Sequence, residues 1–329
     1  MADLITGEGK IRFGFYDEPV DNINYADYAL ETPMDIKVPR LLKKFLVNQF
    51  HFSGIIGPEV IVGMAVVDLK YIANGFLYVY DRKTKTLVET NKITPFGIGG
   101  TIIPTARSYD SSFSSGGLDI AVTSFRMMAS APEINLDIKI TKPTEPLRLC
   151  TRTGYRGWVY MEKTTPIPVS GKVTCKGKTY EISSPDYMGL MDWTTGTMRR
   201  DTYWEWAATA TTLPDGRPFG LNLCCGVNDT SFTENAFWLD GARTKVDTVN
   251  FEFDNHDLHK PWRITSYDKR VALTFNPEGM RGEKLNAVLV KSKFSQFMGT
   301  FEGTLRTESG EILEIRDIPG WAEDHYAKW

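Results

Sequence analysis

The sequence predicts an all-β protein made of two antiparallel, barrel-like domains. Short runs of apolar, β-branched and aromatic residues recur along nearly the whole chain, and turn-forming residues separate them at close spacing. Many short strands in succession are typical of sandwiches and barrels. These runs are too numerous for one small barrel, so we expect the 329 residues to form two.

The first half of the chain opens irregularly and continues as a meander. Its expected strands are 45–55, 59–68, 71–80, 86–91, 118–128, 134–140, 158–160, 171–174 and 178–182. Gly57-Pro58 and Asp81-Arg82-Lys83 are expected turns. Two prolines in Thr164–Pro168 interrupt the pattern, so we expect a seam near 164–185. The predicted domains are therefore 1–170 and 171–329.

The second half repeats this style. Its expected strands are 203–211, 219–227, 235–239, 246–253, 262–266, 271–275, 294–306 and 312–315. Asp215-Gly216 predicts a two-residue hairpin turn that would pair Trp206 with Cys225. One face would then carry Trp204, Trp206, Ala208, Ala210, Phe219, Leu221, Leu223 and Cys225. Glu205 and Asn222 would lie on the other face, and the sequence leaves open which face looks inward.

Composition excludes several classes of partner. The formal charge is -3, from 38 basic and 41 acidic residues without long runs of one sign, so a nucleic-acid partner is not expected. The segment Lys37–Lys44 could touch a membrane surface or form a solvated turn. The N-terminus lacks a signal-peptide pattern and no apolar stretch is long enough to span a membrane, which predicts a cytoplasmic protein.

Cofactor and metal sites are not expected either. The four cysteines, at positions 150, 175, 224 and 225, show no CxxC spacing, so neither disulfides nor a thiolate zinc site is expected. The sequence contains no P-loop, Gly-x-Ser-x-Gly elbow, HExxH or full dinucleotide pattern. Residues 254–259 combine aspartate and histidine in an expected loop, but they lack a distant third partner for a metal.

The centre of the chain combines aromatic rings with carboxylate and amide groups. It contains the segments 192–196, 203–206 and 234–241, which hold four tryptophans among their residues. Such side chains on adjacent strands can line a cavity with apolar walls and a few fixed polar groups. A hydrophobic small molecule is therefore the expected partner.

Four segments carry a family resemblance. Residues 199–207, 221–226, 233–241 and 320–329 resemble the bacterial domain-of-unknown-function family numbered 2804, and the resemblance covers most of the chain. That family is similar, more distantly, to the double lipocalin-like superfamily of hydroxyneurosporene synthase (a carotenoid hydratase), AttH and tocopherol cyclase. The resemblance implies two tandem lipocalin-like, calycin-type barrels and cofactor-free work on large apolar, often isoprenoid, molecules.

Hydration or cyclisation of an alkene requires a carboxylic acid, walls that exclude water and aromatic faces that stabilise a cation. Asp240 is the first candidate for the acid, although Asp240-Gly241 also reads as a turn. The other candidate acids are Glu234, Asp192 and Glu205.

The candidate ligand-binding residues are Trp204, Trp206, Trp238, Asn222, Asn235, Arg200 and His325. His325 lies in a terminal segment bracketed by tryptophans, where it either anchors that segment or joins the site. Arg200 either binds an acidic head group or forms an ion pair within the protein.

Three functions remain open. The first is a cofactor-independent enzyme, a hydratase-like lyase or a cyclase, acting on a lipid-like alkene in a barrel pocket. The second is a carrier for a hydrophobic ligand. The third is a structural protein whose barrels are filled by side chains.

Overall fold

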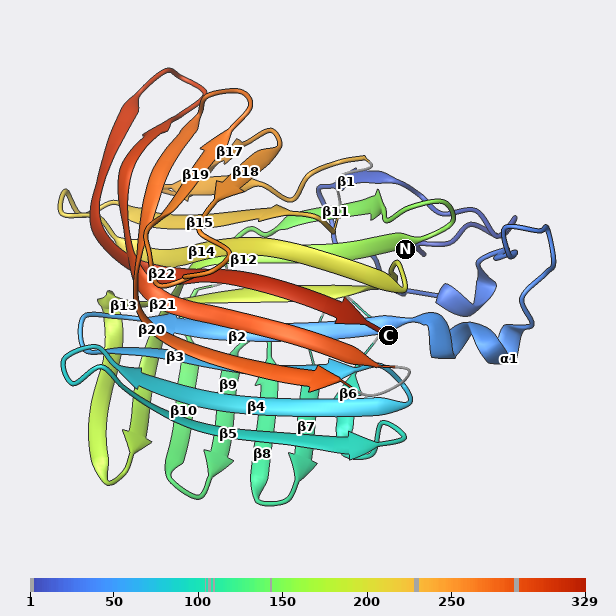
Figure 1. The fold of residues 1–329 in the computed structure, drawn as a ribbon, viewed down its shortest axis with the longest axis horizontal. Coiled ribbons are helices and arrows are strands. Elements are labelled where there is room, and N and C mark those ends of the chain that lie inside the picture. Colours follow the sequence, from blue (N-terminus) through green and yellow to red (C-terminus); the bar gives the residue numbers. More distant parts are fainter. Residues whose placement is uncertain are drawn as a thin grey trace.

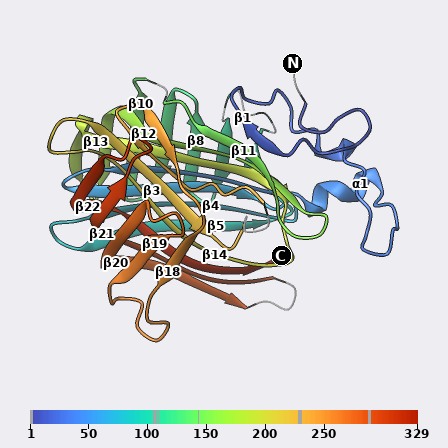
Figure 2. The ribbon, with the colours of Figure 1, turned by 90° about the horizontal axis from the view of Figure 1, so that it is seen from above.

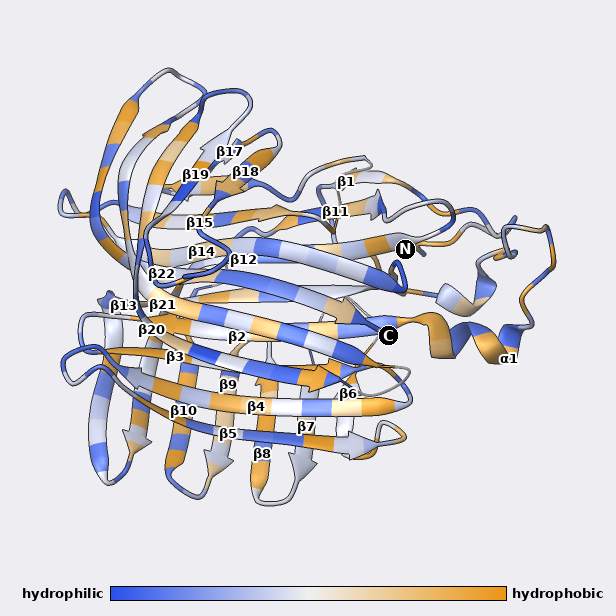
Figure 3. Ribbon diagram, in the orientation of Figure 1, coloured by the Kyte–Doolittle hydropathy of each residue, from blue (hydrophilic) through white to orange (hydrophobic). Residues whose placement is uncertain are grey.

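The computed structural model describes residues 3–103, 105, 108, 110–142, 144–227, 231–286 and 290–329. These residues form two antiparallel sheets, each curled into a half-barrel, which confirms the predicted all-β fold of two tandem barrels (Figure 1). Hydrophobic and hydrophilic residues alternate along many strands (Figure 3). In β10 (Ile134–Ile140), for example, buried and exposed positions follow one another residue by residue.

The first sheet contains thirteen strands, in the order β5-β4-β3-β2-β13-β12-β10-β9-β8-β7-β6, with β11 pairing β12 and β1 pairing β11. Besides β10, they are β1 (Gly14–Tyr16), β2 (Asn48–Ile56), β3 (Val60–Asp68), β4 (Ile72–Asp81), β5 (Thr86–Pro95), β6 (Gly100–Ile102), β7 (Ser111–Ser115), β8 (Leu118–Thr123), β9 (Arg126–Ala131), β11 (Leu147–Arg152), β12 (Trp158–Cys175) and β13 (Lys178–Thr197). The expected strand 118–128 is therefore a hairpin, β8–β9, rather than one strand.

The second sheet contains nine strands, in the order β17-β16-β15-β14-β22-β21-β20-β19-β18. They are β14 (Asp201–Thr212), β15 (Pro218–Cys225), β16 (Ala236–Leu239), β17 (Ala242–Lys245), β18 (Val249–Glu252), β19 (Trp262–Ser266), β20 (Val271–Asn286), β21 (Lys291–Arg306) and β22 (Ile312–Lys328). Three short helical turns precede β2: η1 (Tyr25–Asp27), α1 (Arg40–Lys43) and η2 (Lys44–Leu46).

The predicted boundary between residues 170 and 171 falls inside β12, a strand of the first sheet. The change of sheet falls later, between Thr197 at the end of β13 and Asp201 at the start of β14. The prolines of Thr164–Pro168 do not end a strand, because they lie where the β12–β13 register shifts. Proline is tolerated at such irregularities of a ladder.

The predicted register of the β14–β15 hairpin is wrong by one residue. Trp206 pairs with Cys224, not Cys225. The backbone N–H of Leu213 donates to the carbonyl of Arg217, so the loop between the strands contains three residues rather than the predicted two. A slip of one residue moves every side chain of one strand to the other face. Trp206 therefore shares its face with Asn222 and Cys224, and the predicted all-apolar face does not exist.

Both half-barrel interiors are packed with apolar side chains. One buried cluster fills the first and includes Val66, Phe113 and Trp158. Another fills the second, around Trp262 and Phe297. A filled interior is common in small barrels.

A third cluster joins the sheets to each other. Ile61 and Tyr78 of the first sheet meet Trp206, Met298 and Trp321 of the second. The sheets approach closely here: a Cβ at Gly54 would lie 2.4 Å from the Trp321 ring. The two ribbon views show the sheets lying face to face (Figures 1 and 2). At the end of the molecule where β22 finishes, this packing gives way to a cleft.

Candidate functional site

The cleft lies between the two sheets and not within the interior of either half-barrel. It encloses a cavity of about 250 Å³, lined by strands β2–β5 and β12–β13 of the first sheet and by β14, β15 and β20–β22 of the second. Apolar side chains dominate the lining: Phe50, Phe52, Ala65, Val67, Leu69, Ile72, Phe76, Ile93, Met161, Met198, Trp204, Trp206, Phe294 and Trp329. An apolar cavity with a few convergent polar groups is typical of a ligand site.

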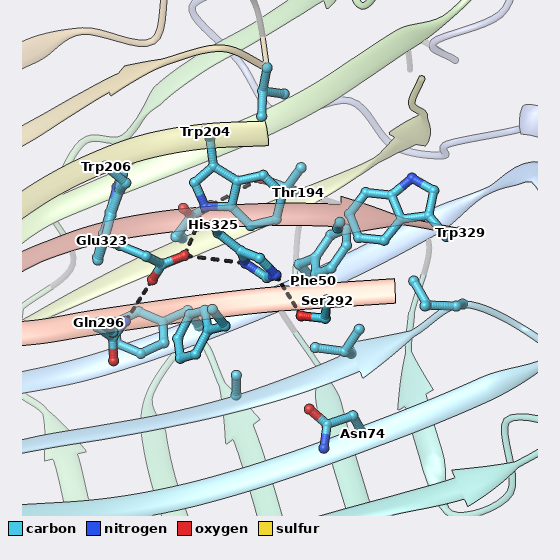
Figure 4. Close-up of a pocket in the computed structure, with 18 of the residues that line it drawn as sticks. Phe50, Asn74, Thr194, Trp204, Trp206, Ser292, Gln296, Glu323, His325 and Trp329 are labelled. Atoms are coloured by element: carbon cyan, nitrogen blue, oxygen red, sulfur yellow. Dashed lines mark hydrogen bonds and ion pairs between the residues drawn. The ribbon is translucent and has the colours of Figure 1, made fainter. Parts of the chain in front are cut away.

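A chain of hydrogen bonds crosses the cleft and ends on Glu323 of β22 (Figure 4). The Trp204 indole N–H donates to Glu323 Oε1 at 2.8 Å, and the Gln296 amide donates to Glu323 Oε2 at 2.9 Å. The Tyr78 hydroxyl, from the first sheet, donates to Gln296 Oε1 at 2.6 Å. Both oxygens of this buried carboxylate therefore accept a hydrogen bond from an uncharged donor.

His325 lies beside Glu323 on the same face of β22, since the two are two positions apart in the strand. Its Nδ1 is 3.5 Å from Glu323 Oε1, and its Nε2 is 3.0 Å from Ser292 Oγ. The imidazole packs against Trp204, with ring centroids 4.1 Å apart, and against Phe294 at 4.9 Å. The ring thus has an acid at one nitrogen, a hydroxyl at the other and aromatic neighbours (Figure 4).

Trp329 extends the aromatic wall toward the first sheet. Its ring lies 6.2 Å from Trp204 and 5.5 Å from Phe50, measured between centroids. The Trp329 indole N–H donates to the carbonyl of Arg199, which fixes the end of the chain. Aromatic faces so arranged can stabilise a positive charge on a ligand.

A second polar group lies in the wall formed by β12, β13 and the segment before β16. The buried Lys163 ammonium is 2.5 Å from Asp192 Oδ2 and 3.1 Å from Glu234 Oε2. Burial disfavours the ammonium charge, but these two carboxylates outweigh it and hold the pKa of Lys163 above its usual value. The wall therefore carries one cation between two anions.

Arg281 of β20 closes the side of the cleft against β5. Its Nε donates to Glu89 Oε1 at 3.0 Å, which links the two sheets. The guanidinium also lies over Phe76, 4.0 Å from the ring centroid, and 4.8 Å from that of Phe294. Because its charge is paired and stacked, Arg281 serves to hold the sheets together at this edge.

Five of the residues predicted from sequence line this one cavity: Asp192, Glu234, Trp204, Trp206 and His325. His325 lines the cleft, and its contact with Ser292 also tethers β22 to β21.

Two predicted acids lie elsewhere. Asp240 is exposed in the β16–β17 turn, with a φ of 50° beside Gly241 at 80°, so the turn interpretation accounts for it. Glu205 points to the face of β14 opposite Trp204 and Trp206, where it accepts a hydrogen bond from the Cys225 thiol at 2.9 Å. Neither lines the cleft.

The remaining predicted ligand-binding residues contact the residues that line the cleft but do not line it themselves. Asn222 accepts the Trp206 indole N–H at 2.9 Å, and Asn235 accepts the backbone N–H of Cys224 at 2.6 Å. Trp238 is buried in a small cluster with Met161. Arg200 lies at the chain end, where Nη1 donates to the Trp329 carbonyl. These four fix side chains or backbone that line the cavity and do not line it themselves.

Sequence reasoning missed Glu323, Gln296, Ser292 and Lys163. The signal for Glu323 was available, because Glu323-Asp324-His325 in a strand puts an acid and an imidazole on one face. Gln296 and Lys163 gave no such signal, since their partners lie far away in the sequence.

Within the part of the chain that the structure describes, no cluster of three or more histidine, cysteine, aspartate or glutamate side chains could hold a metal ion. No helix in the described ranges is long and apolar enough to cross a membrane. The lining of the cleft includes an imidazole and a carboxylate, which are groups that can exchange protons, and aromatic rings that can face a positive charge.

Comparison with known proteins confirms the family resemblance. The family model described as "Domain of unknown function (DUF2804)" matches residues 1–329. No curated protein sequence matches the chain. Among solved structures, the chain is similar to an AttH candidate from Nitrosomonas europaea, with a TM-score of 0.53 and 13% identity over 91% of this chain and 96% of that one. Kievitone hydratase from Nectria haematococca gives a TM-score of 0.49 and 9% identity over 85% and 88%. The likeness to the AttH candidate shows a shared fold only.

Proposed function

The chain belongs to the DUF2804 family, whose description states no activity, and we propose that it is a cofactor-independent enzyme that moves a proton on an apolar, unsaturated ligand held in the inter-sheet cleft. The reaction class is hydration, dehydration or cyclisation of a lipid-like, isoprenoid-type alkene. The proposal rests on the residues of the cleft, because a shared fold does not specify a reaction.

One observation carries the proposal: a carboxylate and an imidazole lie together in an otherwise apolar, aromatic wall. Glu323 is 7% exposed and His325 Nδ1 is 3.5 Å from it. Burying a carboxylate costs free energy unless it is hydrogen-bonded, and here two side-chain donors are committed to it. A buried carboxylate that is held by specific hydrogen bonds, as Glu323 is, is typical of sites where the carboxylate takes part in the chemistry.

His325 is the group that transfers the proton in this account. An imidazole can both donate and accept a proton, and Glu323 Oε1 lies 3.5 Å from Nδ1, where it forms an ion pair with the ring whenever the ring carries the proton. Nε2, next to Ser292 Oγ, is then the nitrogen that exchanges the proton.

In hydration, the proton leaves imidazolium Nε2 and forms a C–H bond, and the adjacent carbon becomes positive. Trp204, Phe294 and Trp329 stabilise that charge through their ring faces. Water adds to the cationic carbon, and the proton that it loses restores the imidazolium. Dehydration is the reverse sequence. In cyclisation a second double bond replaces water as the nucleophile, and the new carbocation that this C–C bond formation leaves then loses a proton to the imidazole, which restores the imidazolium.

Asp192 and Glu234 remain in the proposal as electrostatic groups rather than as acids. Lys163 pairs with both, and Lys245 also interacts electrostatically with Glu234. Asp192 and Glu234 are the members of this group that can stabilise a cationic intermediate in the cleft.

The test combines ligand identification with turnover. Freshly purified protein is examined by native mass spectrometry, and any apolar molecule released by organic extraction is incubated with wild type, His325→Gln and Glu323→Gln. His256→Gln, in an exposed loop, is the matched control. We expect wild type and His256→Gln to shift the product mass by one water or isomerise the ligand, and the two cleft variants to lose at least about two orders of magnitude in rate.

A carrier is the second candidate, favoured by the apolar lining itself. If the protein is a carrier, the wild type should bind the extracted ligand and release it chemically unchanged. Turnover that survives in both His325→Gln and Glu323→Gln would refute the assignment of the proton-transfer groups.

A further inference from the structure

Exposed apolar side chains are concentrated in two short segments. Among the described residues, nineteen large hydrophobic side chains are exposed; six lie in residues 34–46 and four in residues 93–103. Leu41 is 80% exposed and Phe96 is 81% exposed. Single exposed apolar side chains are ordinary, but ten within two short segments call for a physical reason. We call these two segments together the apolar rim.

Basic residues are interleaved with the first segment of the apolar rim. Residues 34–46 contain Lys37, Arg40, Lys43 and Lys44 but one acid, Asp35, which is paired with Arg156 at 2.7 Å. Arg40 is paired with the exposed Asp27 at 3.0 Å and Lys43 donates to the Ala26 carbonyl, so Lys37 and Lys44 contribute most of the exposed positive charge. The Lys44 ammonium lies 4.8 Å from the ring centroid of Phe45. Apolar side chains among lysines and arginines are the composition of surfaces that bind anionic membranes.

The apolar rim is continuous with the cleft. The first segment ends at Leu46, and β2 carries the chain from there to Phe50, which lines the cleft and contacts Trp329. In the second segment, Ile93 lines the cleft and is also 49% exposed. Both ribbon views place α1 at the end of the molecule where the C-terminus lies (Figures 1 and 2).

The backbone joins the second segment to the same end. Phe96 N–H donates to the carbonyl of Tyr71, next to Ile72 in the cleft wall, and Lys70 bridges Asp68 to Gln49 of β2. The two segments are therefore held close to the cleft lining by the β2–β3–β4–β5 ladder.

We propose that the apolar rim docks on an anionic lipid bilayer and that the apolar ligand enters the cleft from that bilayer. The charge selects this occupant: a second copy of the chain would bring the same exposed bases, Lys37 and Lys44, to the contact, and like charges repel. The entry of ligand rests on the proposed function; the docking does not.

The test is co-sedimentation with vesicles of phosphatidylcholine containing about one-third phosphatidylglycerol, beside vesicles of pure phosphatidylcholine. We expect wild type to bind the anionic vesicles, less so at high salt, and the pure phosphatidylcholine vesicles weakly. The variant Leu41→Ser/Leu42→Ser/Phe45→Ser should lose at least about tenfold in partition. Phe125→Ser removes a side chain of 67% exposure from the β8–β9 turn and should bind as wild type does.

Ligand binding is measured separately, by farnesol quenching of tryptophan fluorescence without vesicles. The triple variant should keep this binding, which also shows that it is folded. Equal vesicle binding by wild type and triple variant, or none by wild type, would overturn the docking proposal. Failure of farnesol to bind any variant would instead count against the proposed function and leave the vesicle result standing.

Discussion

Replacing Glu323 with glutamine should destabilise the protein even though the two side chains have nearly the same shape. Glu323 accepts one hydrogen bond from Trp204 and one from Gln296. Glutamine offers one acceptor oxygen and an NH₂ group, so one donor loses its partner and the new NH₂ faces a donor. If Gln296 turns its amide around, its NH₂ can donate to the Tyr78 hydroxyl oxygen, but the Tyr78 O–H then loses its 2.6 Å acceptor, so one donor still lacks a partner.

The cost follows from these contacts. A hydrogen bond to a charged acceptor contributes about 1.5–3 kcal/mol, and an unpaired buried donor costs about 1–3 kcal/mol. We expect Glu323→Gln to lower the free energy of unfolding by about 2–3 kcal/mol, measured by urea denaturation monitored by tryptophan fluorescence. Glu314→Gln makes the same change on an exposed part of β22, where the ion pair with Arg316 lies at the surface, and should cost less than about 1 kcal/mol.

The exchanged pair Glu323→Gln/Gln296→Glu provides the decisive comparison. The acid at 296 can accept from Tyr78 and from the new amide at 323, whose oxygen can accept from Trp204, so every donor regains a partner. We expect the double variant to recover at least half of the lost stability. Equal loss in Glu323→Gln and Glu314→Gln, or a double variant no better than the single, would refute this account of the network.

Three further outcomes are expected in urea denaturation. Lys163→Met removes the ammonium that pairs with Asp192 and Glu234 and should cost about 3–5 kcal/mol; a cost below about 1 kcal/mol would contradict the ion cluster. Burial lowers the pKa of His51 to about 4, so between about pH 6.5 and pH 4 only the unfolded chain binds a proton at this residue. The free energy of unfolding should therefore fall by up to about 3 kcal/mol as the pH is lowered from about 6.5 to about 4. His51→Gln should remove this pH dependence, and His256→Gln should keep it. Gly54→Ala forces a methyl group against the facing tryptophan ring and should cost about 1–3 kcal/mol, whereas Gly7→Ala, with nothing within 4 Å of the new Cβ, should be close to neutral.

Local patterns predicted the strands well, because alternation and turn residues act over a few positions. The strand 262–266 matches β19, and 134–140 matches β10. The ends of strands were harder to predict from the sequence. β13 continues to Thr197, because pairing with β2 and β12 stabilises residues whose own sequence pattern is weak. The β14–β15 register failed for a related reason, because Asp-Gly alone does not fix the number of residues in a loop.

The candidate site could be predicted only where the sequence itself concentrates the residue types. Trp204 and Trp206 were found because they stand in one segment, and both line the cleft. Gln296 lies far along the chain from Tyr78, so nothing local indicates that they meet. The cavity itself arises where the two sheets pack face to face. This packing is a property of the tertiary structure, and the local sequence pattern of neither sheet indicates it.

The central claim is that the cleft between the sheets holds an apolar ligand. Native mass spectrometry with farnesol as the probe tests it directly in wild type, Ala65→Trp and Ala272→Trp. Ala65 lines the cleft on β3, whereas Ala272 is exposed on β20 and serves as the matched control. The account predicts one bound molecule per chain in wild type and Ala272→Trp and none in Ala65→Trp. Binding that persists unchanged in Ala65→Trp would contradict it.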